Sequence, residues 1–211
     1  MITLYTWTTP NGRKASIGLE EAGLPYEVRP VNIGKDEQFA PEFLKVSPNN
    51  KIPAIVDTDV KGDPLPIFES GAILIYLAEK SGRLLPASGP TRFKTLEWLF
   101  WQVGGPGPMF GQLGFFAKRS KEKSELAIKR FTEESDRLLG VMDKRLAETE
   151  YLGGDAFTIA DIATYPWTLA ATTFLGDVLA DSLTTKPSVH RWLTTVGDRP
   201  AVQRGMKVPE V

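Results

Sequence analysis

The order of strand and helix signals most constrains how this chain can fold. Alternating β-prone residues predict strands, and apolar residues at helical spacing predict helices. The signals at the start of the chain are, in order, a strand at 1–7, a helix at 13–23, a strand at 26–31, a short helix at 41–45, strands at 52–57 and 65–68, and a helix at 70–80. This β-α-β order followed by β-β-α predicts a compact α/β domain over residues 1–82.

The pattern changes after this region. Residues 83–90 are rich in Pro, Gly and Ser, which is typical of a linker between domains. The remaining regular patterns are all helical, at 93–103, 109–120, 122–148, 158–174 and 188–196. The Gly- and Pro-rich segment 104–108 interrupts the first two of them. We therefore expect an all-helical domain over residues 91–211, and an overall class of α/β plus all-α.

The composition excludes several classes of function. Lys and Arg total 25 against 26 for Asp and Glu, so the chain lacks the basic excess that nucleic-acid binding requires. It has no cysteine, and hence neither a disulfide nor a thiolate nucleophile of its own. The one histidine, His190, is expected to be structural or at the surface, and no metal site is predicted. Without a signal peptide or a membrane-spanning run, we expect a cytoplasmic protein with no nucleic-acid or membrane partner.

Two short motifs in the N-terminal region are suited to binding a small anion. Ile52-Pro53 lies where a loop leads into a strand, and Glu69-Ser70 lies where a strand leads into a helix. A helix N-terminus offers unpaired N–H groups and the positive end of the helix dipole to an anion. Each motif also has a purely structural interpretation, because proline often precedes a strand and serine often caps a helix.

The same motifs resemble those of the glutathione transferase superfamily along the whole chain. Ile52-Pro53 looks like the cis-proline loop of that family, and Glu69-Ser70 looks like its anchor for the γ-glutamyl group of glutathione. Residues 154–161 look like its capping-box segment, which we assign to folding. Residues 9–12, 49–51 and 98–105 further resemble the bacterial Nu class. The resemblance implies a thioredoxin-like N-terminal domain that binds glutathione, an all-helical C-terminal domain and a homodimer.

In this superfamily the turn after the first strand carries the residue that hydrogen-bonds the glutathione sulfur. The turn holds no tyrosine, serine or cysteine, so Thr9 and Asn11 are the candidate catalytic residues, with Thr8 possible if the register shifts by one. A hydrogen-bond donor at a helix N-terminus lowers the pKa of a thiol by stabilising its charged form. The alternative is that both residues serve only the turn and the helix cap.

The resemblance also implies further binding residues. Besides Ile52, Pro53, Glu69 and Ser70, the candidate glutathione-binding residues are Gln38, Asn50, Lys51 and Arg130. Lys51 suits the glycyl carboxylate, and Arg130 resembles a Nu-class arginine that reaches across the dimer. Either could instead be an ordinary surface cation. A second-substrate pocket would be lined by Trp98, Trp101 and Phe110, although aromatic residues at helical spacing more often form core.

Three functions remain open on the sequence. The leading hypothesis is glutathione-dependent reduction of disulfides, in which glutathione is the substrate that supplies the thiol and no metal takes part. The first alternative is a transferase that conjugates glutathione to an electrophilic small molecule. The second is a non-catalytic protein that binds glutathione and interacts with a partner, which the missing Tyr, Ser or Cys at the turn favours.

Overall fold

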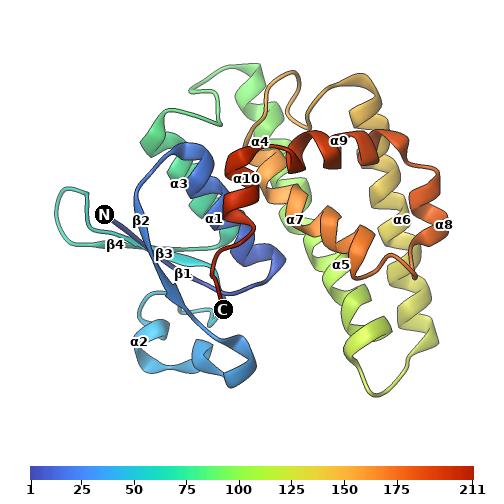
Figure 1. Cartoon of the computed structure of the whole chain (residues 1–211), viewed down its shortest axis with the longest axis horizontal. Coiled ribbons are helices and arrows are strands. Elements are labelled where there is room, and N and C mark those ends of the chain that lie inside the picture. Colours follow the sequence, from blue (N-terminus) through green and yellow to red (C-terminus); the bar gives the residue numbers. More distant parts are fainter. The chain divides into compact units, whose positions relative to one another are not determined.

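The computed structural model describes residues 1–211 and divides into two compact units. Unit 1 comprises Met1–Ala87 together with Asp198–Val211, and unit 2 comprises Ser88–Gly197. Unit 1 contains the sheet and unit 2 is helical (Figure 1), so the predicted fold class is confirmed. The domain limits expected from the sequence, 1–82 and 91–211, remain a prediction.

The sheet of unit 1 has four strands in the order β2-β1-β3-β4. The strands are β1 (Ile2–Thr6), β2 (Tyr26–Pro30), β3 (Ala54–Asp57) and β4 (Leu65–Phe68). β1 and β2 are parallel, so the chain must cross over between them, and helix α1 (Pro10–Ala22) makes this crossover. β3 pairs antiparallel with both β1 and β4.

Alternation along the strands gives the sheet two covered faces. Ile2, Leu4 and Ile55 are buried against α1 and α3 (Ser70–Ser81), where they contact Leu19 and Leu77. Neighbouring residues of the same strands point to the opposite face. Tyr5 and Ala54 pack there with Val31, Phe43 and Ile52, from the segment that contains the turns η1 (Ile33–Lys35) and η2 (Glu37–Phe39) and helix α2 (Pro41–Leu44).

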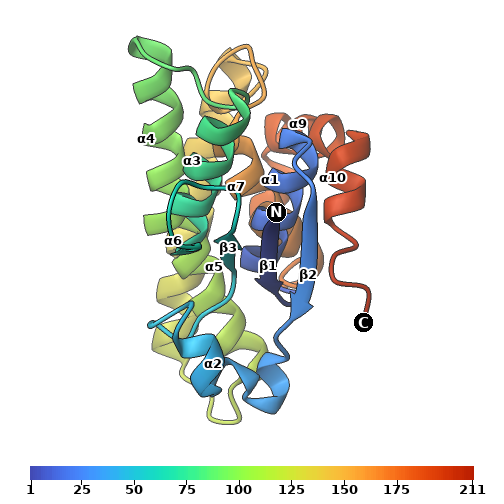
Figure 2. The same cartoon turned by 90° about the vertical axis from the view of Figure 1, so that its left-hand side faces the viewer.

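The last helix, α10 (Pro200–Gly205), packs against α1 within unit 1 (Figure 2). The Ser16 hydroxyl donates to the carbonyl oxygen of Gly205 at 2.7 Å. A Cβ at Gly205 would lie 2.6 Å from the Ile17 Cα, so only glycine allows this approach. The sequence does not predict a helix here, because α10 is too short to show a helical period.

Unit 2 contains six α-helices and one π-helical turn. They are α4 (Pro90–Gly104), α5 (Pro106–Gly114), η3 (Phe115–Arg119), α6 (Glu125–Glu148), α7 (Ile159–Thr173), α8 (Ala180–Thr184) and α9 (Pro187–Gly197). The predicted break at 104–108 is confined to Gly105, because Pro106 and Pro108 fall in the first turn of α5, where no intrahelical N–H is needed. No helix of the chain combines the length and apolarity needed to cross a bilayer.

The predicted capping box at the start of α7 is confirmed. The Thr158 hydroxyl accepts from the Ala160 N–H, and Asp161 Oδ2 accepts from the Thr158 N–H at 3.0 Å. The fully buried Asp161 also accepts from the Leu152 N–H and the Trp192 indole, both at 2.9 Å. Burial raises the pKa of Asp161, and these hydrogen bonds oppose that rise. Asp161 therefore ties three segments of unit 2 together.

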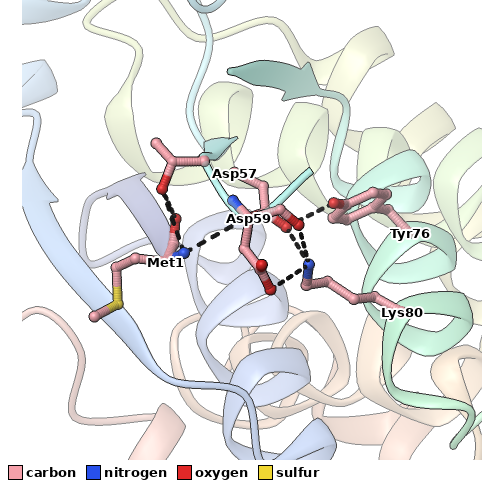
Figure 3. A network of polar contacts seen from close by, with 6 residues as sticks. Met1, Asp57, Asp59, Tyr76 and Lys80 are labelled. Carbon is pink, nitrogen blue, oxygen red and sulfur yellow. Dashed lines mark hydrogen bonds and ion pairs between the residues drawn. The ribbon is translucent and has the colours of Figure 1, made fainter. Parts of the chain in front are cut away.

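A second buried carboxylate, Asp57, connects the sheet to α3 (Figure 3). It accepts a 2.6 Å hydrogen bond from the Tyr76 hydroxyl and lies 2.9 Å from Lys80 Nζ, while the Met1 amine lies 3.8 Å away. Burial alone would raise the pKa of Asp57. The hydrogen bonds from Tyr76, Lys80 and the Asp59 N–H, together with the charge of Lys80, outweigh burial and hold that pKa below its usual value.

This lowered pKa predicts acid sensitivity. The folded state binds the Asp57 proton more weakly than the unfolded state, so the ionised pair contributes fully above about pH 4 and is lost as the pH falls through the folded-state pKa. We expect the free energy of unfolding, measured by urea titration at several pH values, to fall over this range. In Asp57→Asn the fall should be shallower. An identical pH dependence in both proteins would contradict this role.

Candidate functional site

A cavity of about 270 Å³ lies in unit 1, between loops that join the strands and helices. The residues that line it are Asn11, Ser47, Lys51, Ile52, Pro53, Phe68, Glu69 and Ser70. Six of these were predicted from the sequence as site residues, and they come from segments far apart along the chain. The fold therefore brings the turn after β1, the loop before β3 and the start of α3 to one place.

The loop before β3 presents an open length of backbone. The Ile52-Pro53 peptide bond is cis, and pairing of β3 with β1 begins only at Ala54. The loop is held from within, because the Ser47 hydroxyl donates to the Lys51 carbonyl at 2.8 Å and the Asn50 N–H donates to the Ser47 carbonyl at 2.9 Å. The N–H and C=O of Ile52 thus lie at the cavity without a partner in the sheet.

The start of α3 presents a helix N-terminus to the cavity. Glu69 has φ 71° and ψ 115°, an unusual conformation for a residue with a side chain, and it directs the chain sharply into the helix. The N–H groups of the first helical turn, which begins at Ser70, have no intrahelical partner. They coincide with the positive end of the helix dipole. The end of the helix that lines the cavity is therefore suited to a carboxylate.

The structural interpretation of Ser70 as the cap of this helix is wrong. Glu69 is the N-cap, and Ser70 is already the first helical residue. The reason is the positive φ of Glu69, which completes the turn one residue earlier. The Ser70 side chain is consequently not used for capping, and its oxygen accepts a hydrogen bond from Lys14 Nζ at 3.5 Å.

Lys14 was missed by the sequence analysis. It lies on α1 and is 2 % exposed, which is rare for a lysine. Burial lowers the pKa of Lys14 to about 7, against the opposing attraction of Glu69. Lys14 lies one helical turn after Asn11 in a stretch rich in small and apolar residues, but this pattern does not by itself show that the side chain is buried. Ser47 and Phe68 were also missed, because short loops and strand ends carry no periodic pattern.

The turn after β1 places the two candidate catalytic residues at the start of α1. Thr9 is the N-cap, and its hydroxyl oxygen accepts from the Gly12 N–H at 3.0 Å, which leaves the hydroxyl hydrogen able to donate elsewhere. Asn11 is half-buried and lines the cavity, whereas Thr9 does not. Thr8 is exposed and outside the cap.

The other two candidates from the loops of unit 1 lie outside the cavity lining. Asn50 is half-buried with φ 47°, next to Lys51. Gln38 donates weakly to Asp36 at 3.4 Å, and its side-chain oxygen is buried without a hydrogen-bond partner. Across the whole chain, no three His, Cys, Asp or Glu side chains gather as a metal site would require.

The remaining predicted residues belong to unit 2. Arg130 is exposed on α6 and forms no ion pair, although its charge adds to the effect of the Arg137 hydrogen bond in lowering the pKa of Glu134. Trp98 and Trp101 meet edge to face on α4 with ring centroids 5.0 Å apart. Phe110 is 2 % exposed and packs in the core of the unit, which favours the core interpretation.

Comparison with known sequences identifies the family. The family described as glutathione S-transferase, N-terminal domain, matches residues 1–79, and the glutathione S-transferase C-terminal domain matches residues 107–200. The chain belongs to the glutathione S-transferase family. A relative from Escherichia coli K12, the disulfide-bond oxidoreductase YfcG, is 48% identical over 208 residues, covering 98% of this chain and 94% of YfcG.

Solved glutathione transferase structures agree with this assignment. A family member from Pseudomonas fluorescens with two glutathione bound has a TM-score of 0.95 and 50% identity, covering 99% of this chain and 93% of that one. A glutathione transferase from Pseudomonas putida, with one glutathione disulfide bound per subunit, has a TM-score of 0.94 and 45% identity, covering 99% and 91%. These likenesses extend over both units of the chain.

The close packing at the start of α1 gives a test of the site's architecture. A Cβ at Gly12 would lie 2.2 Å from the Trp7 carbonyl oxygen and 2.6 Å from Thr6 Oγ1. We expect Gly12→Ala to lower the free energy of unfolding by about 2 kcal/mol or more, measured by chemical denaturation. Gly104→Ala is the matched control, because a Cβ there meets no atom within 4 Å. Equal stability of the two variants would show that the turn is looser than described.

Proposed function

We propose that the chain reduces disulfides with glutathione and uses no thiol of its own. The observation that carries this proposal is the cavity, where a helix N-terminus suited to a carboxylate lies beside open backbone in a chain without cysteine. Two relatives support it by name, the Escherichia coli disulfide-bond oxidoreductases YfcG and YghU, the second 43% identical over 97% of this chain and 73% of YghU.

Glutathione would bind in the cavity in an extended form. The carboxylate of the γ-glutamyl residue would accept hydrogen bonds from the N–H groups and the hydroxyl at Ser70. The ammonium group of the same residue would pair with the carboxylate of Glu69. The cysteinyl unit would pair with the backbone of Ile52 ahead of Pro53, as an added strand does. Lys51 is suited to the glycyl carboxylate. Asn50 and Gln38 would contribute further hydrogen bonds to the tripeptide, and Arg130 would contact it from across the dimer.

The sulfur would then lie at the N-terminus of α1. Thr9 and Asn11 would donate hydrogen bonds to it, and the positive helix end would add to their effect. Both lower the thiol pKa and so raise the thiolate fraction at neutral pH. The thiolate attacks one sulfur of the substrate disulfide, the S–S bond breaks, and the leaving sulfur takes up a proton. A second glutathione attacks the mixed disulfide, which gives oxidised glutathione and frees the other substrate thiol.

We further propose a Nu-class homodimer in the cytoplasm. Large apolar side chains on unit 2 are well exposed, namely Phe93, Phe100 and Leu126, at 66%, 60% and 80%. Exposed apolar side chains of this kind are typical of an interface between subunits, where the partner buries them. Arg130 is one helical turn after Leu126, so it would reach a glutathione held by the partner subunit.

A cytoplasmic location suits the chemistry, because glutathione is kept mainly reduced there.

The test is glutathione-dependent reduction of a small model disulfide by the purified protein, measured as oxidised glutathione formed. We expect turnover well above the uncatalysed exchange and a loss of roughly tenfold or more in Thr9→Ala and in Asn11→Ala. Thr9→Ser keeps the hydroxyl and should retain most of the activity. Thr8→Ala is the matched control and should behave as wild type.

Other outcomes would favour the other functions. Background rates with disulfides but turnover of electrophilic small molecules would replace reduction by conjugation, for which Trp98 and Trp101 are the candidate pocket residues. Glutathione binding without turnover of either substrate would favour a binding protein. Wild-type rates in both Thr9→Ala and Asn11→Ala would remove these residues from the mechanism.

A further inference from the structure

A lysine is buried directly behind the cavity wall. Lys14 is 2 % exposed and is among the largest fully buried side chains of the chain. Its ammonium nitrogen lies 3.5 Å from the hydroxyl oxygen of Ser70, which lines the cavity. An ammonium group loses several kcal/mol of hydration when it is buried, so an apolar side chain of similar length would favour folding more. The position of this charge therefore requires an explanation other than stability.

Lys14 is linked to the cavity from two directions. On α1 it follows Asn11 by three residues, so the two side chains emerge on the same face of the helix, and Asn11 lines the cavity. Across the unit it contacts the first residue of α3, at the helix end whose N–H groups are unpaired. The ammonium group thus lies on the protein side of the surface that a bound carboxylate would meet.

The hydrogen bond has a definite direction when Lys14 is charged, which it is below its lowered pKa of about 7. An ammonium group can only donate, so the Ser70 oxygen is then the acceptor and the Ser70 hydroxyl hydrogen is left to donate to another group. Ser70 is 9% exposed and is part of the cavity lining, which leaves a ligand as a fitting acceptor. The positive charge of Lys14 also offsets the negative charge of Glu69 at the same helix end.

We propose that Lys14 is a positioning residue that makes the cavity selective for a ligand with a free α-carboxylate beside its α-ammonium group. It does so by orienting the Ser70 hydroxyl and by adding positive charge behind the N-terminus of α3. The Glu69 carboxylate recognises the ammonium group of the same ligand. This inference rests on the proposed binding of glutathione in the cavity and names what selects the γ-glutamyl end.

The test compares two ligands by calorimetry at pH 6, where Lys14 is mainly charged, with no disulfide present. One is glutathione, and the other is 4-aminobutanoyl-cysteinyl-glycine, which lacks only the α-carboxylate of the γ-glutamyl residue. We expect Lys14→Met to weaken glutathione binding about tenfold and to leave binding of the analogue unchanged. The melting temperature should not fall, because the variant removes a desolvated charge. Lys61→Met, at an exposed position of the same unit, is the matched control and should bind both ligands as wild type does.

A double-mutant cycle tests the route through Ser70. Lys14 acts partly through the Ser70 hydroxyl. The double variant should therefore lose less glutathione affinity than the product of the fold losses in Lys14→Met and Ser70→Ala. If Lys14→Met does not fold, Lys14→Gln keeps a donor to Ser70 without the charge and should still reduce the preference for glutathione over the analogue.

Equal weakening of both ligands, unchanged glutathione affinity or full additivity with Ser70→Ala would overturn the proposal. These binding measurements do not depend on catalysis. A protein that binds glutathione but reduces no disulfide would therefore contradict the proposed reaction and not the role of Lys14. Failure of the wild-type protein to bind glutathione would instead overturn the binding site on which both rest.

Discussion

Two helix N-termini converge on one cavity, and the rest of the site depends on this convergence. Asn11, in the first turn of α1, and Ser70, the first residue of α3, both line the cavity. Each helix start leaves backbone N–H groups without intrahelical partners and carries partial positive charge. A ligand with negative charge at two points along its length, such as a carboxylate and a thiolate, would satisfy both ends at once.

The sheet explains why these helix ends meet. β1 and β3 are neighbours in the sheet order β2-β1-β3-β4, and the sheet continues to β4 beside β3. α1 follows β1 and α3 follows β4, and the two helices pack on the same face of the sheet. The loop before β3 closes the cavity from a third side and leaves the Ile52 backbone unpaired. A site of this kind needs no reactive side chain, which is consistent with a chain that has no cysteine.

The sequence predicted those parts of the structure that have a local pattern. Strand alternation, helical spacing and the Thr158–Asp161 box each depend on residues close together in the chain, and each is present in the structure. Lys14 could not be found in this way, because its burial and its contact with Ser70 depend on residues 56 positions apart. The N-cap at Glu69 was missed for a related reason, since a positive φ leaves no compositional signal unless glycine occupies the position. The short helix α10 likewise owes its place to contacts with α1.

The central claim is that the protein ionises the thiol of a bound glutathione, and titration of that thiol tests it most directly. The chain has no cysteine, so the ultraviolet absorbance of thiolate in the saturated complex comes from the ligand alone. The account predicts that the thiol pKa of bound glutathione lies below that of free glutathione, and that Thr9→Ala returns it toward the free value. A bound thiol that titrates at the same pH as free glutathione would contradict the account.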